Sequence, residues 1–225
     1  IEREISSLDT FGVGIFEQEV QEAIELAKNY EVISPFIYSK LDKKVLVKLP
    51  KLKLVATRST GFDHIDSDYC KSKKIKIATV PEYGSDTVAE YAFALLLAIA
   101  KKVVVANESV EDGNFSPEGL TGVDLKGKTL GVIGVGKIGQ NVVKIARGFG
   151  MKVLGVDAYK DPKMVKKAGF EYADLETCLK KADFVTLHVP ANPKTFHLIN
   201  KTNIKLMKSG SYIINTARGA VVEIE

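Results

Sequence analysis

Three glycines and one aspartate have the residue types and spacing that bind a dinucleotide. Gly134, Gly136 and Gly139 form a G-x-G-x-x-G pattern. In this pattern the first glycine permits a tight turn, the second lets the backbone approach a pyrophosphate, and the third lets a helix pack closely on a sheet. Asp157 follows roughly 20 residues later, where its carboxylate can accept hydrogen bonds from the adenosine ribose.

The residues around the glycines predict the elements that would position them. Residues 130–133 are an apolar run typical of a buried parallel strand, and residues 140–147 have apolar side chains at helical intervals. Residues 151–156 form a second apolar run that ends at Asp157. This order is the first β-α-β unit of a dinucleotide-binding fold, whereas a glycine-rich loop without a ligand does not require it. The helix N-terminus would offer N–H groups to an anion.

Three further predicted strand ends carry unusual residues, at 58–61, 188–190 and 215–218. Ligands of parallel sheets bind at the carboxyl ends of the strands. Arg218 offers a planar pair of donors that fits a carboxylate and can polarise a neighbouring carbonyl. The alternative for Arg218 alone is a surface arginine that caps the sheet. Its neighbours, Asn-Thr-Ala before it and Gly219 after it, favour the functional role.

The first 83 residues predict a small doubly wound unit. The expected helices are 17–30, 40–49 and 66–73, and the expected strands are 31–34, 52–56 and 75–78. Alternating strands and helices favour a parallel sheet. Residues 81–85 break the pattern, so we expect one domain at 1–83 and a second at 84–225.

A long helix is expected to open the second domain. Thr87 followed by Glu90 resembles a capping box, and the helix would run from Val88 to about Asn107. Its residues are apolar nearly all round, so the helix must be covered on several sides. We expect it to lie between domains or against a second subunit, which predicts a homodimer.

The remaining residues continue the α/β alternation. The expected helices are 161–168, 175–181 and 203–208, and the expected strands are 183–189 and 211–217. The chain stops at Glu225 where another helix is expected, so the sequence resembles a portion of a longer protein.

The composition is that of an ordinary soluble globular protein, with 45% hydrophobic and 27% charged residues. The net charge of +4 includes lysine pairs scattered along the chain, which indicate solvated faces and no nucleic-acid-binding stripe. Cys70 and Cys178 lack C-x-x-C spacing, so they indicate neither a disulfide framework nor a metal site, and they fit a reducing cytosol. The longest apolar run, residues 91–100, is too short to cross a bilayer. We expect a cytoplasmic protein without membrane or nucleic-acid partners.

The whole chain resembles the D-2-hydroxyacid dehydrogenase family. The matching segments are Arg-Ser-Thr-Gly-Phe-Asp-His-Ile-Asp at 58–66, Val-Pro-Glu-Tyr at 80–83, Val-Ala-Glu at 88–90, the glycine segment at 131–139, Leu-His-Val-Pro at 187–190 and Ile-Asn-Thr-Ala-Arg-Gly at 214–219. Their joint occurrence in this order is highly specific. Within the family the chain looks most like the D-lactate dehydrogenase branch, and Tyr83 favours a small alkyl substrate over the phosphoglycerate type.

The resemblance implies an α/β fold with two doubly wound parallel-sheet domains, both incomplete here: a Rossmann-like NAD domain and a smaller flavodoxin-like substrate domain. It implies hydride transfer between NAD(H) and a small D-2-hydroxy or 2-keto acid. Arg218 would be the catalytic arginine, the Thr60 and Gly61 amides would hold the substrate carboxylate, and Tyr83 would line the pocket. For Thr60 and Gly61 the alternative is an ordinary turn, and for Tyr83 a structural role in the hinge.

The resemblance also implies a set of cofactor contacts. They are Gly134, Gly136, Lys137, Ile138 and Gly139 at the pyrophosphate, Asp157 at the ribose, and Val189, Pro190, Thr195, Thr216, Ala217 and Arg218 along the rest of the dinucleotide. His188 resembles a histidine that packs near the adenine site and is not an acid or base. His64 and His197 have loop contexts typical of structural histidines.

The chain departs from the family pattern after Arg218. The family's acid/base is a histidine assisted by a glutamate, both downstream of the arginine, and neither has a counterpart here. Two alternatives stay open: an NAD-sensing interaction protein of the corepressor type on the same fold, and a binding-only remnant.

Overall fold

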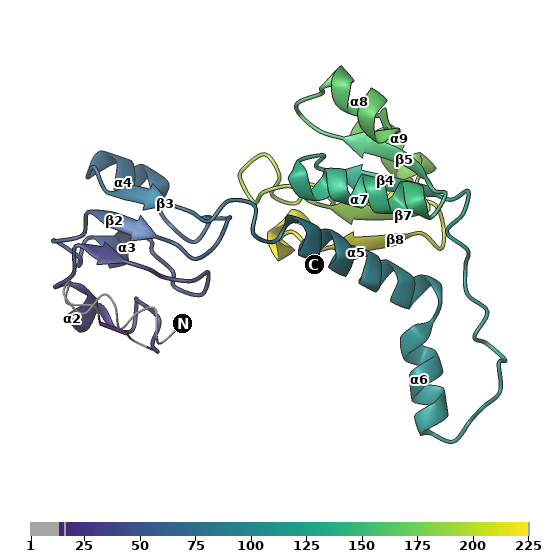
Figure 1. Cartoon of the computed structure of the whole chain (residues 1–225), viewed down its shortest axis with the longest axis horizontal. Coiled ribbons are helices and arrows are strands. Elements are labelled where there is room, and N and C mark those ends of the chain that lie inside the picture. Colours follow the sequence, from purple (N-terminus) through teal and green to yellow (C-terminus); the bar gives the residue numbers. More distant parts are fainter. Residues whose placement is uncertain (1–13, 16, 225) are drawn as a thin grey trace. The chain divides into compact units, whose positions relative to one another are not determined.

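The computed structural model describes residues 14, 15 and 17–224, except for the side chain of Lys167. The chain divides between Tyr83 and Gly84 into two compact units, which we call unit 1 and unit 2. Each unit has its own sheet, and every strand pair in both sheets is parallel (Figure 1). The expected α/β class with two parallel sheets is therefore confirmed.

Unit 1 is built on a sheet of three strands. Their order is β1 (Val32–Ile33), β2 (Leu54–Ala56) and β3 (Lys76–Ala78). The helices are α2 (Ile24–Ala27), α3 (Lys43–Leu46) and α4 (Ser67–Ser72). Asp42 and Asp66 begin α3 and α4, because each carboxylate accepts a hydrogen bond from a backbone N–H of the first turn. Leu41, Leu46 and Val55 are among the most buried side chains of this core.

Two helices of unit 1 are shorter than expected, and residues next to both of them make tertiary contacts. The helix expected at 17–30 is reduced to α2; in the segment before it the Val20 N–H donates to the Ser39 hydroxyl, and the Gln21 side chain accepts from the Lys40 N–H. The helix expected at 40–49 is reduced to α3, since Leu41 pairs with Ile65 in a parallel bridge.

Unit 2 is built on a sheet of five parallel strands, and the strand that comes first in the sequence lies at the centre of the sheet. Their order is β6 (Glu171–Tyr172), β5 (Lys152–Val156), β4 (Thr129–Ile133), β7 (Phe184–Leu187) and β8 (Tyr212–Asn215). The helices are α5 (Ser85–Ala100), α6 (Val103–Glu111), α7 (Lys137–Gly148), α8 (Pro162–Ala168) and α9 (Leu175–Lys181), with 3₁₀ turns η2 (Ile204–Leu206) and η3 (Gly219–Val221). Strand β6 was not expected, and the expected helix at 203–208 is only the turn η2.

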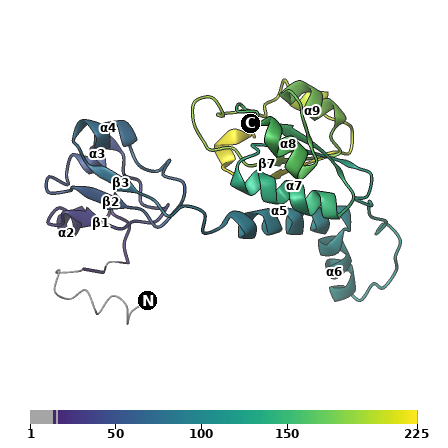
Figure 2. The same cartoon turned by 45° about the horizontal axis from the view of Figure 1, so that its top comes forward.

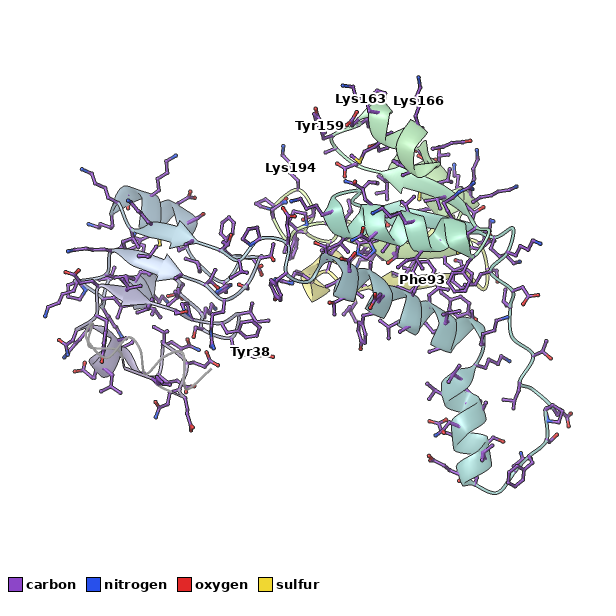
Figure 3. The ribbon with its side chains drawn as sticks, in the orientation of Figure 1. Tyr38, Phe93, Tyr159, Lys163, Lys166 and Lys194 are labelled. Atoms are coloured by element: carbon purple, nitrogen blue, oxygen red, sulfur yellow. The ribbon has the colours of Figure 1, made fainter. Side chains whose placement is uncertain are left out.

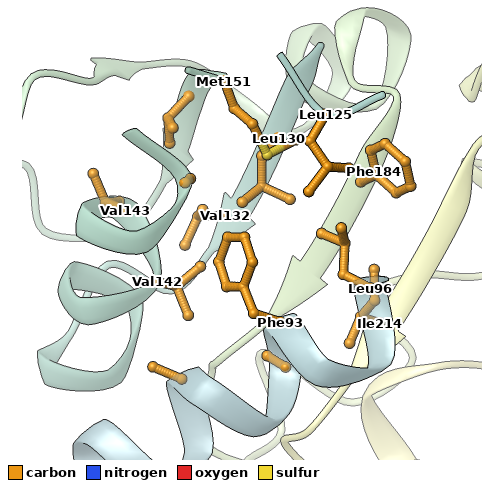
Figure 4. Packing of buried hydrophobic residues seen from close by; sticks show 14 of the residues in the cluster. Phe93, Leu96, Leu125, Leu130, Val132, Val142, Val143, Met151, Phe184 and Ile214 are labelled. Atoms are coloured by element: carbon orange, nitrogen blue, oxygen red, sulfur yellow. The ribbon is translucent and has the colours of Figure 1, made fainter. Parts of the chain in front are cut away.

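Helices cover both faces of this sheet. On one face α5 and α7 lie side by side and bury Phe93 and Val142 against Leu130 and Val132 of β4 (Figures 2 and 4). On the other face α9 packs against β4 and β5. Lys163 and Lys166 on α8 project outward, as expected for a solvated face (Figure 3).

The long helix differs from its prediction in two ways. It begins at Ser85 after Gly84, whose carbonyl accepts from the Val88 N–H, so the capping box at Thr87 was wrong. It also ends at Ala100, because the returning chain uses the Ala100 carbonyl as the acceptor for the Val123 N–H at 2.7 Å. Lys102 then adopts a left-handed conformation, with φ of 54°, and the separate helix α6 follows.

The outer residues of these helices are exposed within the single chain. Helix α6 has no buried residue, and Val103, Val104 and Val105 are each more than half exposed. Tyr91 on α5 is exposed as well. The expected cover of this helix by a second subunit therefore stays a prediction.

Candidate functional site

Four chain segments leave the sheet of unit 2 at its carboxyl edge, and they carry most of the predicted site residues. They are the glycine turn after β4, Asp157 after β5, residues 188–190 after β7 and residues 216–218 after β8. The strand that follows β4 in sequence, β5, lies toward one edge of the sheet, and the strand that follows β7, β8, lies toward the other edge. The strand order therefore reverses between the neighbours β4 and β7. A crevice at such a switch point is the usual ligand site of an open parallel sheet.

The glycine turn has the properties that a pyrophosphate requires. Gly134 has a φ of +93°, and a Cβ there would lie 2.6 Å from the His188 carbonyl oxygen. A Cβ on Gly139 would lie 2.1 Å from the Gly134 carbonyl oxygen, so only glycine lets α7 approach the turn this closely. A Cβ on Gly136 would meet no protein atom within 4 Å. The backbone at Gly136 is thus open on the side from which an anion would approach the start of α7.

The carboxylate of Asp157 holds the glycine turn in place. One oxygen accepts a hydrogen bond from the Val135 N–H at 2.7 Å, and the other accepts from the Tyr159 N–H at 2.9 Å. An ionised carboxylate has about four acceptor sites, so it can also accept from ribose hydroxyls. Tyr159 itself is 78% exposed and projects outward (Figure 3).

His188 lies between two threonine hydroxyls at the ends of β7 and β8. Its Nε2 is 2.9 Å from the Thr186 hydroxyl, and its Nδ1 is 3.4 Å from the Thr216 hydroxyl. Burial lowers the pKa of His188 to about 4, because desolvation disfavours the imidazolium. The ring is therefore neutral near pH 7 and connects the two strand ends.

Arg218 follows a turn that the Asn215 side chain closes. The Asn215 Oδ1 accepts from the Ala217 N–H at 3.0 Å, and its Nδ2 donates to the Arg218 carbonyl at 2.9 Å. The half-buried Arg218 side chain also donates through Nη1 to the Ala217 carbonyl. Sequence reasoning treated Asn215 only as context, although an asparagine at a strand end is a known signal for such a turn.

The segment after β7 forms a loop that Thr195 closes. The Thr195 hydroxyl donates to the Pro190 carbonyl at 2.5 Å and accepts from the Asn192 N–H at 3.0 Å. The loop and η3 together border an open, mainly apolar hollow of about 470 Å³; it is lined by Ala191, Asn192, Pro193, Phe196 and Ala220. Val189 lies against the glycine turn, since its Cγ1 is 3.0 Å from a Cβ built on Gly134.

In unit 1 the structure brings Thr60 and Gly61 together in a turn after β2. The Thr60 hydroxyl donates to the Val80 carbonyl at 2.8 Å, and the Gly61 carbonyl accepts from the Ser59 hydroxyl at 2.7 Å. Tyr83, the last residue of the unit, is 63% exposed. Between Thr57, Ser59 and His64 there is a buried hydrogen-bond network that sequence reasoning missed.

The described residues contain neither of two other kinds of site. No group of three or more His, Cys, Asp or Glu side chains there is placed to hold a metal ion. None of the helices in those residues combines the length and apolar character that a membrane crossing requires.

The strand order and the glycine turn of unit 2 define a nucleotide-binding α/β protein of the Rossmann class. Residues 93–225 match the family model described as D-isomer specific 2-hydroxyacid dehydrogenase, NAD binding domain. The chain therefore belongs to the D-isomer specific 2-hydroxyacid dehydrogenase family, and its cofactor is NAD.

Relatives of known function support this membership. A glyoxylate reductase of Thermococcus litoralis is 39% identical over 207 residues, covering 89% of this chain and 62% of the relative. The D-lactate dehydrogenase of Escherichia coli is 37% identical over 205 residues, covering 90% of this chain and 62% of the relative. The chain thus spans less than two thirds of the length of these relatives.

A solved structure is similar over nearly the whole chain. It is the D-lactate dehydrogenase from Aquifex aeolicus complexed with NAD and lactic acid, with a TM-score of 0.94 and 41% identity. The match covers 99% of this chain and 67% of that one.

Proposed function

We propose that the protein interconverts a small D-2-hydroxy acid and its 2-keto acid with NAD(H), most effectively D-lactate and pyruvate. The observation that carries the proposal is the meeting of the glycine turn, Asp157 and Arg218 at the carboxyl edge of one sheet. The similarity to a D-lactate dehydrogenase complexed with lactic acid supports the small substrate.

The cofactor would be held by unit 2, as its NAD domain (residues 84–225). When bound, NAD supplies or accepts the hydride. The open backbone at Gly136 and the amides of Lys137, Ile138 and Gly139 would hold the pyrophosphate, and Asp157 would accept from the ribose hydroxyls. The walls would be Val189, Pro190, Thr195, Thr216 and Ala217.

Each unit would contribute its own substrate-binding residues: Arg218 in unit 2, and Thr60, Gly61 and Tyr83 in unit 1, the substrate domain (residues 1–83). The Arg218 guanidinium would bind the carboxylate and stabilise the charge that develops on the keto oxygen. The amides of Thr60 and Gly61 are oriented by a turn with short internal hydrogen bonds, and they would donate to a substrate carboxylate. Tyr83 would limit the size of the substrate side chain.

We also propose that the protein is a cytoplasmic homodimer. The exposed apolar residues of α5 and α6 support this assembly, because contact with a second copy would remove them from water.

Arg218→Lys in the full-length protein tests the function. Lysine keeps the charge but lacks the planar pair of donors. We therefore expect the transition state to lose roughly 3 kcal/mol of stabilisation, as for loss of one oxyanion donor, so that kcat/KM for pyruvate falls on the order of 100-fold. NADH affinity, measured by fluorescence titration, should change little, because the glycine turn and Asp157 would hold most of the dinucleotide. Pyruvate, glyoxylate and phenylpyruvate should be compared for the wild type, and failure to reduce any of them would refute the proposal.

A further inference from the structure

Behind the turn at residues 59–61, unit 1 contains a buried chain of polar side chains. Thr57 and Ser59 are 2% and 3% exposed. The His64 Nε2 is 3.2 Å from the Thr57 hydroxyl, the two hydroxyls are 2.8 Å apart, and the Ser59 hydroxyl is 2.7 Å from the Gly61 carbonyl oxygen. A buried hydroxyl that loses its partner costs about 1–3 kcal/mol, so these groups are strongly coupled to one another.

The number of protons fixes the direction of every hydrogen bond in the chain. The Gly61 carbonyl can only accept, so Ser59 uses its single proton to donate to it. Thr57 must then donate to the Ser59 oxygen, since the Pro35 carbonyl at 3.5 Å is a much weaker acceptor position. With its own proton used, Thr57 can only accept from His64. The imidazole is therefore the Nε2–H tautomer.

This chain fixes the orientation of one peptide group of the turn. In a trans peptide the C=O and the following N–H point in opposite directions, and no peptide bond here is cis. Since Ser59 draws the Gly61 carbonyl inward, the Phe62 N–H points outward. On the other side of the turn the Ser59 carbonyl accepts from the Val80 N–H at 3.1 Å, which likewise directs the Thr60 N–H away from Val80.

The amides of this turn are available to a ligand. Across the described part of the chain, no protein group accepts a hydrogen bond from the N–H of Thr60, Gly61 or Phe62. Neighbouring N–H groups without protein acceptors form a site for a single anionic group such as a carboxylate.

We propose that Thr57, Ser59 and His64 are positioning residues that hold this turn for the substrate carboxylate, with the Phe62 N–H as a further donor. The proposal rests on the function proposed above. It assigns to His64 an indirect role in substrate binding, through Thr57 and Ser59, and no role in proton transfer.

Thr57→Val and Thr57→Ser in the full-length protein form a matched pair. Valine keeps the shape but removes the hydroxyl, whereas serine keeps the hydroxyl. We expect Thr57→Val to raise the KM for pyruvate about tenfold, with NADH affinity unchanged, because one charge-assisted contact to the carboxylate is lost. Thr57→Ser should keep the wild-type KM. Ser59→Ala should behave as Thr57→Val does, and it keeps the test decisive if the valine variant does not fold.

Cys70→Ala separates positioning from a general loss of stability. Cys70 is 1% exposed in the same core, and its replacement should lower Tm without changing the KM. Equal KM values for wild type, Thr57→Val and Ser59→Ala would overturn the inference. If wild type reduces no 2-keto acid, the proposed function fails instead.

The hydrogen-bond chain also has a readout that does not depend on turnover. Long-range ¹H–¹⁵N correlation spectra of the imidazole should show His64 protonated at Nε2 and not at Nδ1. In Thr57→Val this preference should weaken. A wild-type His64 protonated at Nδ1 would reverse the direction of the chain and overturn the inference.

Discussion

Alanine substitutions at three glycines of unit 2 should separate cofactor binding from folding. Gly136 and Gly139 belong to the glycine turn and the first turn of α7, and Gly148 ends the same helix. A Cβ would meet no protein atom within 4 Å at Gly136 or Gly148, but would lie 2.1 Å from a backbone oxygen at Gly139. Gly139 alone therefore lacks space for a methyl group, and of the other two glycines only Gly136 lies at the predicted pyrophosphate site.

The structure gives the size of the Gly139→Ala effect. Ordinary contact begins near 3.4 Å, so the Cβ and the Gly134 oxygen must move apart by about 1.3 Å. Overpacking of this kind costs up to ~3 kcal/mol, and alanine returns up to ~1 kcal/mol through its better helix propensity. The net loss of about 2 kcal/mol should lower the Tm of unit 2 by about 6 °C. NADH affinity should fall as well, because α7 moves away from the turn.

Gly136→Ala should weaken cofactor binding without a loss of stability. Its methyl group contacts no protein atom, so the Tm should stay within about a degree of wild type. The methyl group would occupy the space through which a pyrophosphate approaches the backbone, so the Kd for NADH should rise at least about tenfold. Gly148→Ala is the control, with unchanged NADH affinity and a slightly raised Tm.

The assays are fluorescence titration with NADH and thermal unfolding of each variant. Wild-type NADH affinity in Gly136→Ala would show that no anion approaches this backbone. Wild-type stability in Gly139→Ala would show that α7 does not pack on the turn as described.

Three further predictions concern protonation, coenzyme choice and assembly. The folded-state pKa of His188 is about 4, below the ordinary 6.5. Between these two pH values the unfolded protein binds a proton at His188 and the folded protein does not, so stability falls as the pH drops from 6.5 to 4. His188→Gln should lack up to about 3 kcal/mol of the unfolding free energy that the wild type loses over this pH range. Parallel curves of unfolding free energy against pH for the two proteins would contradict this. Asp157 should give the full-length protein a kcat/KM for NADH at least about tenfold above that for NADPH, and equal values would count against its role at the ribose. Val104→Asp on α6 should convert a dimer into a monomer in sedimentation velocity, whereas a monomeric wild type would refute the proposed assembly.

The sequence predicted those features that depend on neighbouring residues. The glycine turn, α9 and the aspartate that begins α8 are local patterns, and the structure has them as expected. The fold class, the family and the NAD cofactor are confirmed for the same reason, since the motifs that indicate them are short and occur in a fixed order. The individual site residues stay predictions.

Features that depend on distant partners could not be predicted. The end of α5 is set by Val123, which takes the Ala100 carbonyl, and the late start of α3 is set by Leu41, which pairs with Ile65 in a bridge. Periodicity in a single segment carries no information about such competition for backbone groups. The series of hydrogen bonds from His64 to Gly61 was missed for a different reason. In the sequence its members look like ordinary loop residues, and only the fold buries them together.

The two hydrogen bonds of Asp157 restrict how this protein could evolve a preference for NADP. A 2′-phosphate disfavours a carboxylate beside it, so the obvious first mutation removes Asp157. That mutation also removes the acceptor of the Val135 N–H and releases the turn on which either coenzyme would depend. A lineage that changes coenzyme must therefore gain a new acceptor for Val135 and a cation for the phosphate before it loses the aspartate. A variant that has lost Asp157 and has gained neither the acceptor nor the cation would bind both coenzymes poorly. A single mutation is therefore not enough to change the coenzyme preference.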